Sequence, residues 1–542
     1  MSLKSTPIGP IPEDTAHLLQ AVLPKGNTVT KLRDEFGTIY TDESFAKLFP
    51  VRGQPALAPW RLALVTVLQF LENLTDRQAA QAVKLRLDWK YALGLELTDR
   101  GFDPSVLCEF RARLVGGQAE QLLFDTLLEH LKTKGFLKPG GKQRTDSTHV
   151  LATVRTLNHL ELLGETLRAA LNEVASTAPE WLGGFAPPSW FERYAHRVED
   201  YRLPKAKAAR ETYARVTGED GFLLLEGIEQ EESLKPLQSL EAVSVLRLIW
   251  SQHYERKDGV VRLLEGEALP KGAERLCSPY ELEARSSGKR GTWWVGYKAH
   301  LTETCDEEDV HLITHVQTTL ATVQDVSCTS ETQEALRDKG LAPKQHLVDA
   351  GYVDAELLVD SQRRGVELIG PLRPNTSWQT KVEGAFDVSH FEIDFEGKKV
   401  TCPQGKVSAG WFPGSDRHER PAITVGFHKR DCEPCSVRSC CTRAKVGPRM
   451  LKLQPREVHE AVRVVQERGL GEPYNLRAGV EGTISQGTRS FGLRRCRYRG
   501  LARTRLQHAV TAAAMNVSRV MAWLGGQGSA KGQSSHFAAL KA

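Results

Sequence analysis

Three acidic residues in distant segments of the chain have surroundings suited to binding a divalent cation. Asp146 lies in RTDSTHV and Asp349 in HLVDAGY, each within or just after a short β-type run, whereas Glu481 lies in the helical pattern YNLRAGVEGTISQGTR. Mg²⁺ and Mn²⁺ prefer oxygen ligands, and two such ions can activate a nucleophile and stabilise the leaving oxygen of a phosphodiester. Each acid alone also fits a simpler role, as a turn or helix cap for the two aspartates and as a surface ion pair for Glu481.

The segment around Glu481 is strongly basic. Residues 441–542 carry 18 Lys and Arg against 5 Asp and Glu, a net charge of +13, whereas the whole chain has only +5. Such an asymmetry indicates a surface for nucleic acid or another polyanion, although a basic face can also be only solvated. Arginine suits bidentate contacts with phosphate. The arginines of residues 474–500 are Arg477, Arg489, Arg494, Arg495, Arg497 and Arg499.

Tyr474 opens this basic segment. Its hydroxyl could contact a phosphate, or its ring could stack on a base. A packed aromatic side chain is the alternative interpretation.

Five of the ten cysteines are crowded into residues 402–441. Cys432 and Cys435 form a C-x₂-C pair that follows Cys402 by 30 residues, and Cys440 or Cys441 can supply a fourth thiolate. In a chain expected in the cytosol, this pattern predicts a Zn²⁺ site before it predicts disulfides, with Cys440 as the first choice for the fourth ligand. Reduced, partly buried thiols are the alternative.

Composition places the chain among ordinary globular proteins. It has 542 residues, of which 40% are hydrophobic and 26% charged, so two to four folded units are expected. No apolar run approaches the roughly 18–20 residues that span a bilayer. The start lacks a basic region followed by an apolar block, so we expect no signal peptide, no membrane partner and a cytoplasmic location.

Hydrophobic periodicity predicts helices first and a sheet later. Apolar residues recur at three- and four-residue steps from Pro55, which predicts a helical module that binds DNA or is an ordinary bundle, with Arg111 and Arg113 exposed. WWVGYKAHLTE and VHLITHVQTTLAT predict a β-hairpin, and HLVDAGY begins a strand–turn–helix unit. Leu501–Leu524 predicts an amphipathic helix. A hairpin followed by strand–helix alternation indicates an α/β sheet.

The expected organisation has six segments. They are an N-terminal arm (1–50), a helical DNA-binding domain (51–135), the first part of a catalytic core (136–372) with a helical insert at about 157–275, a Cys-rich insert (373–455), the C-terminal part of the core (456–526) and a flexible tail (527–542).

The three acidic segments resemble the active-site blocks of DDE transposases of bacterial insertion sequences. The third block is similar to the family signature of Tyr, two residues, Arg, three residues, Glu, six residues and Lys, which Tyr474, Arg477 and Glu481 match. Thr488 stands at the final position, with Arg489 beside it as a candidate phosphate contact. WWVGYKAHLTET and FGLRRCRYRGLARTRLQHAVTAAAMN resemble the branch with an N-terminal helical module and a helical insert after the first Asp.

The resemblance implies an α/β fold, with a ribonuclease-H-like mixed sheet, flanking helices, an N-terminal helical domain and inserts. It implies that Asp146, Asp349 and Glu481 bind two Mg²⁺ or Mn²⁺ ions for cut-and-paste transposition, with a hairpin intermediate as in similar enzymes. Its partners would be double-stranded DNA, as terminal inverted repeats and as target, and a second copy of the chain. A nuclease without strand transfer and a non-catalytic DNA-binding descendant are the two alternatives.

Overall fold

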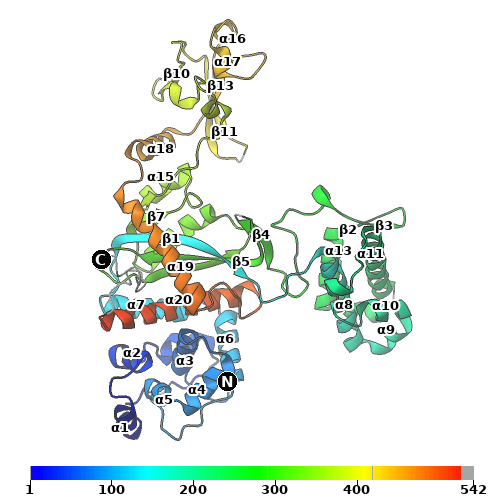
Figure 1. Cartoon of the computed structure of the whole chain (residues 1–542), viewed down its shortest axis with the longest axis vertical. Coiled ribbons are helices and arrows are strands. Elements are labelled where there is room, and N and C mark those ends of the chain that lie inside the picture. Colours follow the sequence, from blue (N-terminus) through cyan, green and yellow to red (C-terminus); the bar gives the residue numbers. More distant parts are fainter. Residues whose placement is uncertain (1, 6, 231, 290, 418, 527–542) are drawn as a thin grey trace, which may run out of the picture.

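The chain folds into four regions, which a computed structural model shows (Figure 1). The structure describes residues 2–5, 7–230, 232–289, 291–417 and 419–526. A central sheet lies above the N-terminal helices, a helical insert extends to one side, and a Cys-rich lobe stands at the far end. The predicted flexible tail, residues 527–542, lies outside the described residues.

The central sheet has six strands of mixed direction. They are β1 (Gly140–Leu151), β4 (Arg285–Lys289), β5 (Thr292–Thr304), β6 (Ile313–Leu320), β7 (Pro343–Val348) and β8 (Glu367–Ile369). β5 pairs antiparallel with β1, β4 and β6, whereas β7 runs parallel to β1 and β8 parallel to β7. The predicted β5–β6 hairpin and the predicted α/β class are therefore confirmed, and the mixed sheet is consistent with a ribonuclease-H-like core.

Helices cover both faces of this sheet. Those of the core are α7 (Leu122–Thr133), η5 (Asp325–Ser327), α14 (Cys328–Asp338), α15 (Ala355–Arg363), α18 (Arg456–Arg468), η8 (Glu472–Ala478), α19 (Gly479–Ser490) and α20 (Leu501–Leu524). The bounds of α20 are those predicted, but residues 506–517 are buried on every side. The reason is that α20 lies between β6 and the N-terminal helices, so the face expected to meet solvent meets protein instead (Figure 1).

The N-terminal helices share one hydrophobic core with α20 and the sheet. They are α1 (Glu13–Val22), α2 (Thr28–Phe36), η1 (Asp42–Leu48), α3 (Pro59–Leu71), α4 (Asp76–Leu85), α5 (Leu87–Leu93) and α6 (Ser105–Gly116). Residues 1–50, expected as an arm, include α2, which packs on α5 and α20.

Arg111 of α6 was expected to be exposed, and that expectation is wrong. Its side chain bonds Asp76 at 2.5 Å and lies 4.7 Å above the ring of Tyr498. Because Tyr498 belongs to the C-terminal part of the chain, this arginine is buried where the helical module docks on the core.

The helical insert has its own hydrophobic core. It contains α8 (His159–Thr177), α9 (Pro179–Phe185), α10 (Pro188–Tyr194), η2 (Asp200–Arg202), α11 (Lys207–Gln230), η3 (Glu232–Leu234), α12 (Lys235–Gln238), α13 (Glu241–His253), β2 (Tyr254–Lys257), β3 (Val260–Leu263) and η4 (Gly266–Ala268). The β2–β3 hairpin lies in a segment that the sequence pattern had predicted to be helical.

The Cys-rich lobe is built from short elements. They are η6 (Trp378–Lys381), η7 (Val388–His390), β9 (Glu392–Asp394), β10 (Lys399–Thr401), β11 (Gly410–Ser415), β12 (Pro421–Gly426), α16 (Lys429–Cys432), α17 (Arg438–Cys441) and β13 (Met450–Leu453). Its buried core has only six apolar residues, Phe391, Val400, Val425, Phe427, Leu451 and Leu453.

Candidate active site

Strands β1 and β7 bring Asp146 and Asp349 to the same end of the sheet. Thr145 of β1 pairs with Val348 of β7 in the parallel ladder. The residue that follows Thr145 is Asp146, and the residue that follows Val348 is Asp349. Neighbouring strands lie about 4.8 Å apart, and residues in register project from the same face. Asp349 directly follows β7, and its Oδ1 accepts a hydrogen bond from the Gly351 N–H at 2.8 Å.

Arg477 joins Asp146 to Glu481. Its guanidinium lies 2.7 Å from Oδ2 of Asp146 and 3.3 Å from Oε1 of Glu481. The side chains of Arg477 and Asp146 are only 16% and 11% exposed, whereas that of Glu481 is 68% exposed. Since a buried charge needs a partner, Arg477 supplies the positive charge between the first and third acids.

All three acids line one cleft of about 760 Å³, which we call the acidic cleft. Its walls also contain Tyr474, Arg477, Arg489 and Arg494. Segments far apart in the chain therefore place carboxylates and arginines around one opening, the combination that phosphodiester chemistry requires.

The charge of Asp146 is poorly stabilised. Burial raises the pKa of Asp146, and the charge of Asp349 raises it further. The N–H of Ser147 and the charges of Arg477 and Lys289 act in the opposite direction without cancelling the rise. A cation placed near both aspartates would relieve this unfavourable electrostatic energy.

The donor set fits a hard divalent cation. Carboxylate oxygens are the ligands that Mg²⁺ and Mn²⁺ prefer, and three carboxylates share the acidic cleft. Across the described residues, no three His, Cys, Asp or Glu side chains are already arranged around a common metal position. Arg477, bonded to both Asp146 and Glu481, stands between two of the three proposed ligands.

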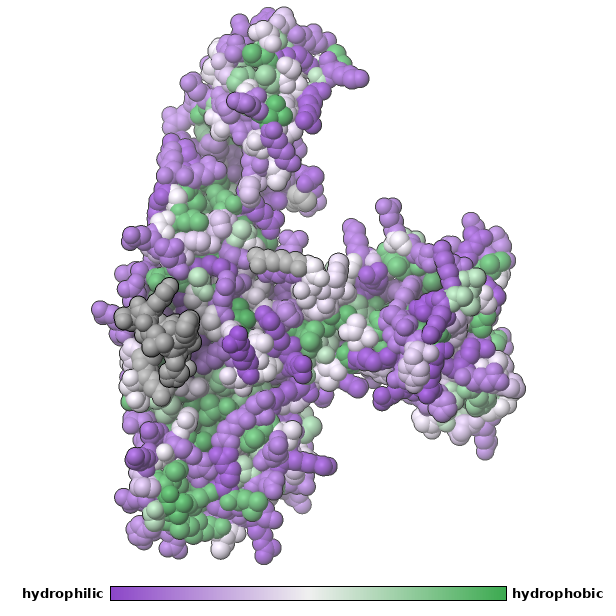
Figure 2. Space-filling view, viewed as in Figure 1, coloured by the Kyte–Doolittle hydropathy of each residue, from purple (hydrophilic) through white to green (hydrophobic). Residues whose placement is uncertain are grey.

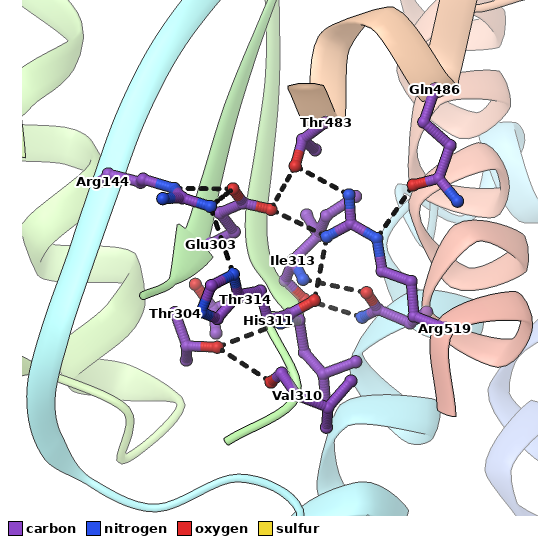
Figure 3. Close-up of polar contacts among 12 residues, drawn as sticks. Arg144, Glu303, Thr304, Val310, His311, Ile313, Thr314, Thr483, Gln486 and Arg519 are labelled. Atoms are coloured by element: carbon purple, nitrogen blue, oxygen red, sulfur yellow. Dashed lines mark hydrogen bonds and ion pairs between the residues drawn. The ribbon is translucent and has the colours of Figure 1, made fainter. Parts of the chain in front are cut away.

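A buried polar network behind the acidic cleft positions these residues (Figure 3). Glu303 of β5 is fully buried and accepts hydrogen bonds from Arg144 at 2.7 Å, Arg519 at 2.7 Å and Thr483 at 2.5 Å. Burial opposes its ionisation, but the Arg519 and Arg144 charges hold the pKa of Glu303 below its usual value. We call Glu303, Arg144, Arg519 and Thr483 the Glu303 network.

The Glu303 network fixes the start of α19 against the sheet. Thr483 lies two residues after Glu481, and Arg144 donates to the Leu476 carbonyl at 2.5 Å, just before Arg477. A Cβ on Gly479 would lie 2.0 Å from Nη1 of Arg144, so a larger residue here would displace the guanidinium from this position. Arg144 and Asp146 are two residues apart on β1, so their side chains point to the same face of the sheet. One strand therefore carries both a proposed ligand and a residue that supports it.

The predicted phosphate contacts divide into two groups. Arg489 and Arg494 line the acidic cleft, and Nε of Arg494 donates to Oγ1 of Thr148 at 2.7 Å. Arg495 and Arg499 are exposed but lie outside the residues that line it.

Arg497 faces the N-terminal helices rather than the acidic cleft. It donates to the Leu74 carbonyl at 2.8 Å and to Asn73, and it lies 4.3 Å above the ring of Phe70. Burial lowers the pKa of Arg497. The loop after α19 leaves the cleft at Arg494 and reaches the helical module here, so Arg497 has a structural role in docking the two.

Lys298 and Asp325 are residues near the site that sequence reasoning missed. Lys298 of β5 lines the acidic cleft, and its Nζ bonds Oδ1 of Asp325 at 2.9 Å. Oδ2 of Asp325 in turn accepts from the Ser147 hydroxyl at 3.3 Å, beside Asp146. The available signal was a lysine in the middle of the strand pattern WWVGYKAHLTE.

A second cavity, of about 350 Å³, lies in the Cys-rich lobe. It is lined by Cys402, Cys432, Cys435 and Cys441, whereas Cys440, the predicted fourth ligand, is absent from its lining. All ten cysteines of the chain are free thiols.

Comparison with known proteins found two family matches. Residues 401–521 match the family described as "Transposase DDE domain", and residues 17–113 match "Transposase domain (DUF772)". The first match includes Glu481 and the basic segment, while Asp146 and Asp349 lie outside both. Among curated proteins, no sequence matches the chain. Within the described residues, no helix is both long and apolar enough to cross a membrane.

Proposed function

Because the chain belongs to the DDE transposases of bacterial insertion sequences, we propose that Asp146, Asp349 and Glu481 are its catalytic acids and that it cuts DNA at the ends of its element. One observation carries the proposal: three acids from distant segments line the same cleft, and Arg477 bonds two of them. The family match alone gives only the class of enzyme.

The carboxylates would hold two Mg²⁺ or Mn²⁺ ions. When bound, such a pair activates the attacking oxygen and stabilises the leaving oxygen of a phosphodiester. Asp146 and Asp349 would share one ion, a proposal supported by the pairing of the preceding residues, Thr145 and Val348, in the parallel ladder. Glu481, the most exposed of the three, would close the site from α19.

The arginines of the acidic cleft would bind the DNA backbone. Arg477, Arg489 and Arg494 line it, and Nε of Arg477 is buried without an acceptor among the described residues. A phosphate oxygen would satisfy that N–H with a charge-assisted hydrogen bond. Tyr474, at the same opening, would contact phosphate or base, and the exposed Arg495 and Arg499 would extend the basic path.

Cut-and-paste transposition needs two DNA ends and a target. The 3′-hydroxyl freed by cleavage, with or without a hairpin intermediate, would attack the target strand in the same cleft. Figure 2 shows a wide concave space between the Cys-rich lobe and the helical insert, where the DNA would lie. Two copies of the chain would hold the paired inverted repeats in the bacterial cytoplasm, where the DNA is.

The proposal is tested on DNA that carries the element's ends. Asp146→Asn, Asp349→Asn and Glu481→Gln should each abolish Mg²⁺- or Mn²⁺-dependent cleavage while DNA binding is retained. Glu472→Gln, an exposed acid of η8 outside the acidic cleft, is the matched control and should cleave normally. Cleavage at the wild-type rate by one of the three variants would remove that residue from the site.

Recovery of insertion products separates transposition from simple nuclease action. The wild-type chain should join the cleaved end to target DNA, and sequencing of the products should find the end joined through its 3′-hydroxyl. Cleaved ends without any joined product would instead identify a nuclease.

A further inference from the structure

Four cysteines of the Cys-rich lobe face one cavity. Cys402, Cys432, Cys435 and Cys441 line it, and Cys402, Cys432 and Cys441 also pack against the same apolar core. Four thiols around one space are the ligand set of a structural Zn²⁺ site. We propose that these four residues bind one Zn²⁺ ion, with Cys441 rather than Cys440 as the fourth ligand.

Short elements present the thiols from two directions. Cys402 follows β10 in a tight turn, in which its N–H donates to the Lys406 carbonyl and its carbonyl accepts from Gly405, both at 2.8 Å. Cys432 ends α16, and Cys435 comes three residues later. Arg438 ties these two together, since its guanidinium reaches the Cys432 carbonyl at 3.3 Å and its N–H reaches the Cys435 carbonyl at 3.1 Å.

The choice between Cys440 and Cys441 follows from the helix that carries both. Adjacent residues of a helix point about 100° apart, and of these two cysteines only Cys441 is among the residues that line the cavity. Cys441 packs against the core of the lobe together with Cys402 and Cys432. Cys440 is not among the residues of that core or of the cavity, and its carbonyl accepts from the Phe386 N–H at 2.8 Å.

The charges around the cavity match a zinc–thiolate centre. Zn²⁺ with four thiolates has a net charge of −2. The cavity is lined by Lys406, Arg430, Arg438 and Arg449, against the one acid Asp431. Nearby cations favour thiolate over thiol, so these side chains would stabilise the charged centre.

The lobe also needs a source of stability beyond its core. Six buried apolar residues are few for a segment of this size, and small units with such cores commonly depend on a metal or disulfides. All five cysteines here are free thiols, so each is available as a ligand. In the described structure no three thiols yet surround a common metal position, so binding would draw α16 and α17 together to Zn–S distances of about 2.3 Å.

Zinc content of the purified full-length chain tests the assignment. The wild-type protein and Cys440→Ser should each contain one zinc per chain by plasma mass spectrometry, whereas Cys441→Ser should contain less than a tenth of that. A wild-type chain without zinc, or a Cys440→Ser variant that loses it while Cys441→Ser keeps it, would overturn the proposal. The result does not depend on DNA cleavage, so it stands or fails separately from the proposed function.

Alkylation of the wild-type chain gives a second answer that needs no variant to fold. Iodoacetamide should modify Cys440 in the native protein but leave Cys402, Cys432, Cys435 and Cys441 unmodified until a zinc chelator is added. Peptide mass mapping reads each position. Equal modification of all five cysteines before the chelator is added would exclude the site.

Discussion

The acidic cleft and the Glu303 network lie on the same face of the sheet, but they shift the pKa values of their buried carboxylates in opposite directions. Glu303 is fully buried between two arginines, which keep its pKa low. Asp146, two residues from Arg144 on β1, shares its arginine partner with Glu481. Burial and the charge of a neighbouring aspartate raise the pKa of Asp146. A carboxylate that is fully paired with arginines makes the structure around it rigid. A carboxylate that is incompletely paired has an uncompensated negative charge, which a bound cation can neutralise.

Removing the carboxylate of the Glu303 network should have the largest effect on stability. Glu303→Gln would leave Arg144 and Arg519 buried with a neutral partner, and breaking such a pairing costs about 3–5 kcal/mol. Denaturant unfolding, followed by a probe on the core, measures this loss. Glu307→Gln, an exposed acid just beyond β5, is the control and should change stability by less than about 0.5 kcal/mol. Equal stability of the two variants would contradict the assigned role of the network.

Thr483 links the Glu303 network to Glu481, so its loss should affect stability less but cleavage clearly. Thr483→Val removes the hydrogen bond that Thr483 donates to Glu303 and the one that it accepts from Arg519, and a hydrogen bond to a charged group is worth about 1.5–3 kcal/mol. We expect slower cleavage with DNA binding unchanged, because the start of α19 would be held less firmly. Thr133→Val is the control, since the exposed Thr133 hydroxyl bonds within its own helix, to the Glu129 carbonyl, and the residue does not line the acidic cleft. Cleavage at the wild-type rate by Thr483→Val would show that the network does not position Glu481.

The two kinds of arginine should separate by salt dependence. Arg494→Gln would remove a phosphate contact of the acidic cleft, which should weaken DNA binding and lower the slope of log affinity against log salt by about 1. Arg497→Gln, three residues on, should leave the slope unchanged and destabilise the docking of the helical module instead. Titrations at several salt concentrations decide the matter, and the same slope for Arg494→Gln and wild type would exclude phosphate contact there.

The pH dependence of stability should show the same contrast on a smaller scale. The pKa of Glu303 is lower in the folded state, so its contribution is present above the unfolded pKa of about 4.3 and is lost as the pH falls through the folded value. The pKa of Asp146 is raised, so its ionisation opposes folding above that raised value. The unfolding free energy of Glu303→Gln should therefore decrease less than that of the wild type as the pH is lowered from neutral to acid. Asp146→Asn should therefore gain stability at neutral pH, and a loss there would contradict the electrostatic account of the cleft.

Local patterns were enough to predict much of the fold. The alternation in β5 and β6, the strand–turn–helix unit after β7 and the bounds of α20 were all readable, since each depends on residues close in sequence. Thr75 caps α4 and Gln78 completes the capping box, a local pattern of the same kind.

Contacts between distant segments could not be read in the same way. Arg111 and Arg497 look like exposed basic residues until the helical module docks on the core. Glu303 gives no local signal, because its three partners come from β1, α19 and α20. The orientation of α17, which turns Cys441 rather than Cys440 toward the cavity, is likewise set by packing.

The central claim is that three distant acids share the same metal ions, and Mn²⁺ affinity of the full-length chain tests it most directly. Titration followed by the paramagnetic signal of free Mn²⁺ should show tight binding by the wild type and by Glu472→Gln. Asp146→Asn, Asp349→Asn and Glu481→Gln should each weaken that binding at least tenfold. Wild-type affinity in any of these three variants would contradict the shared site.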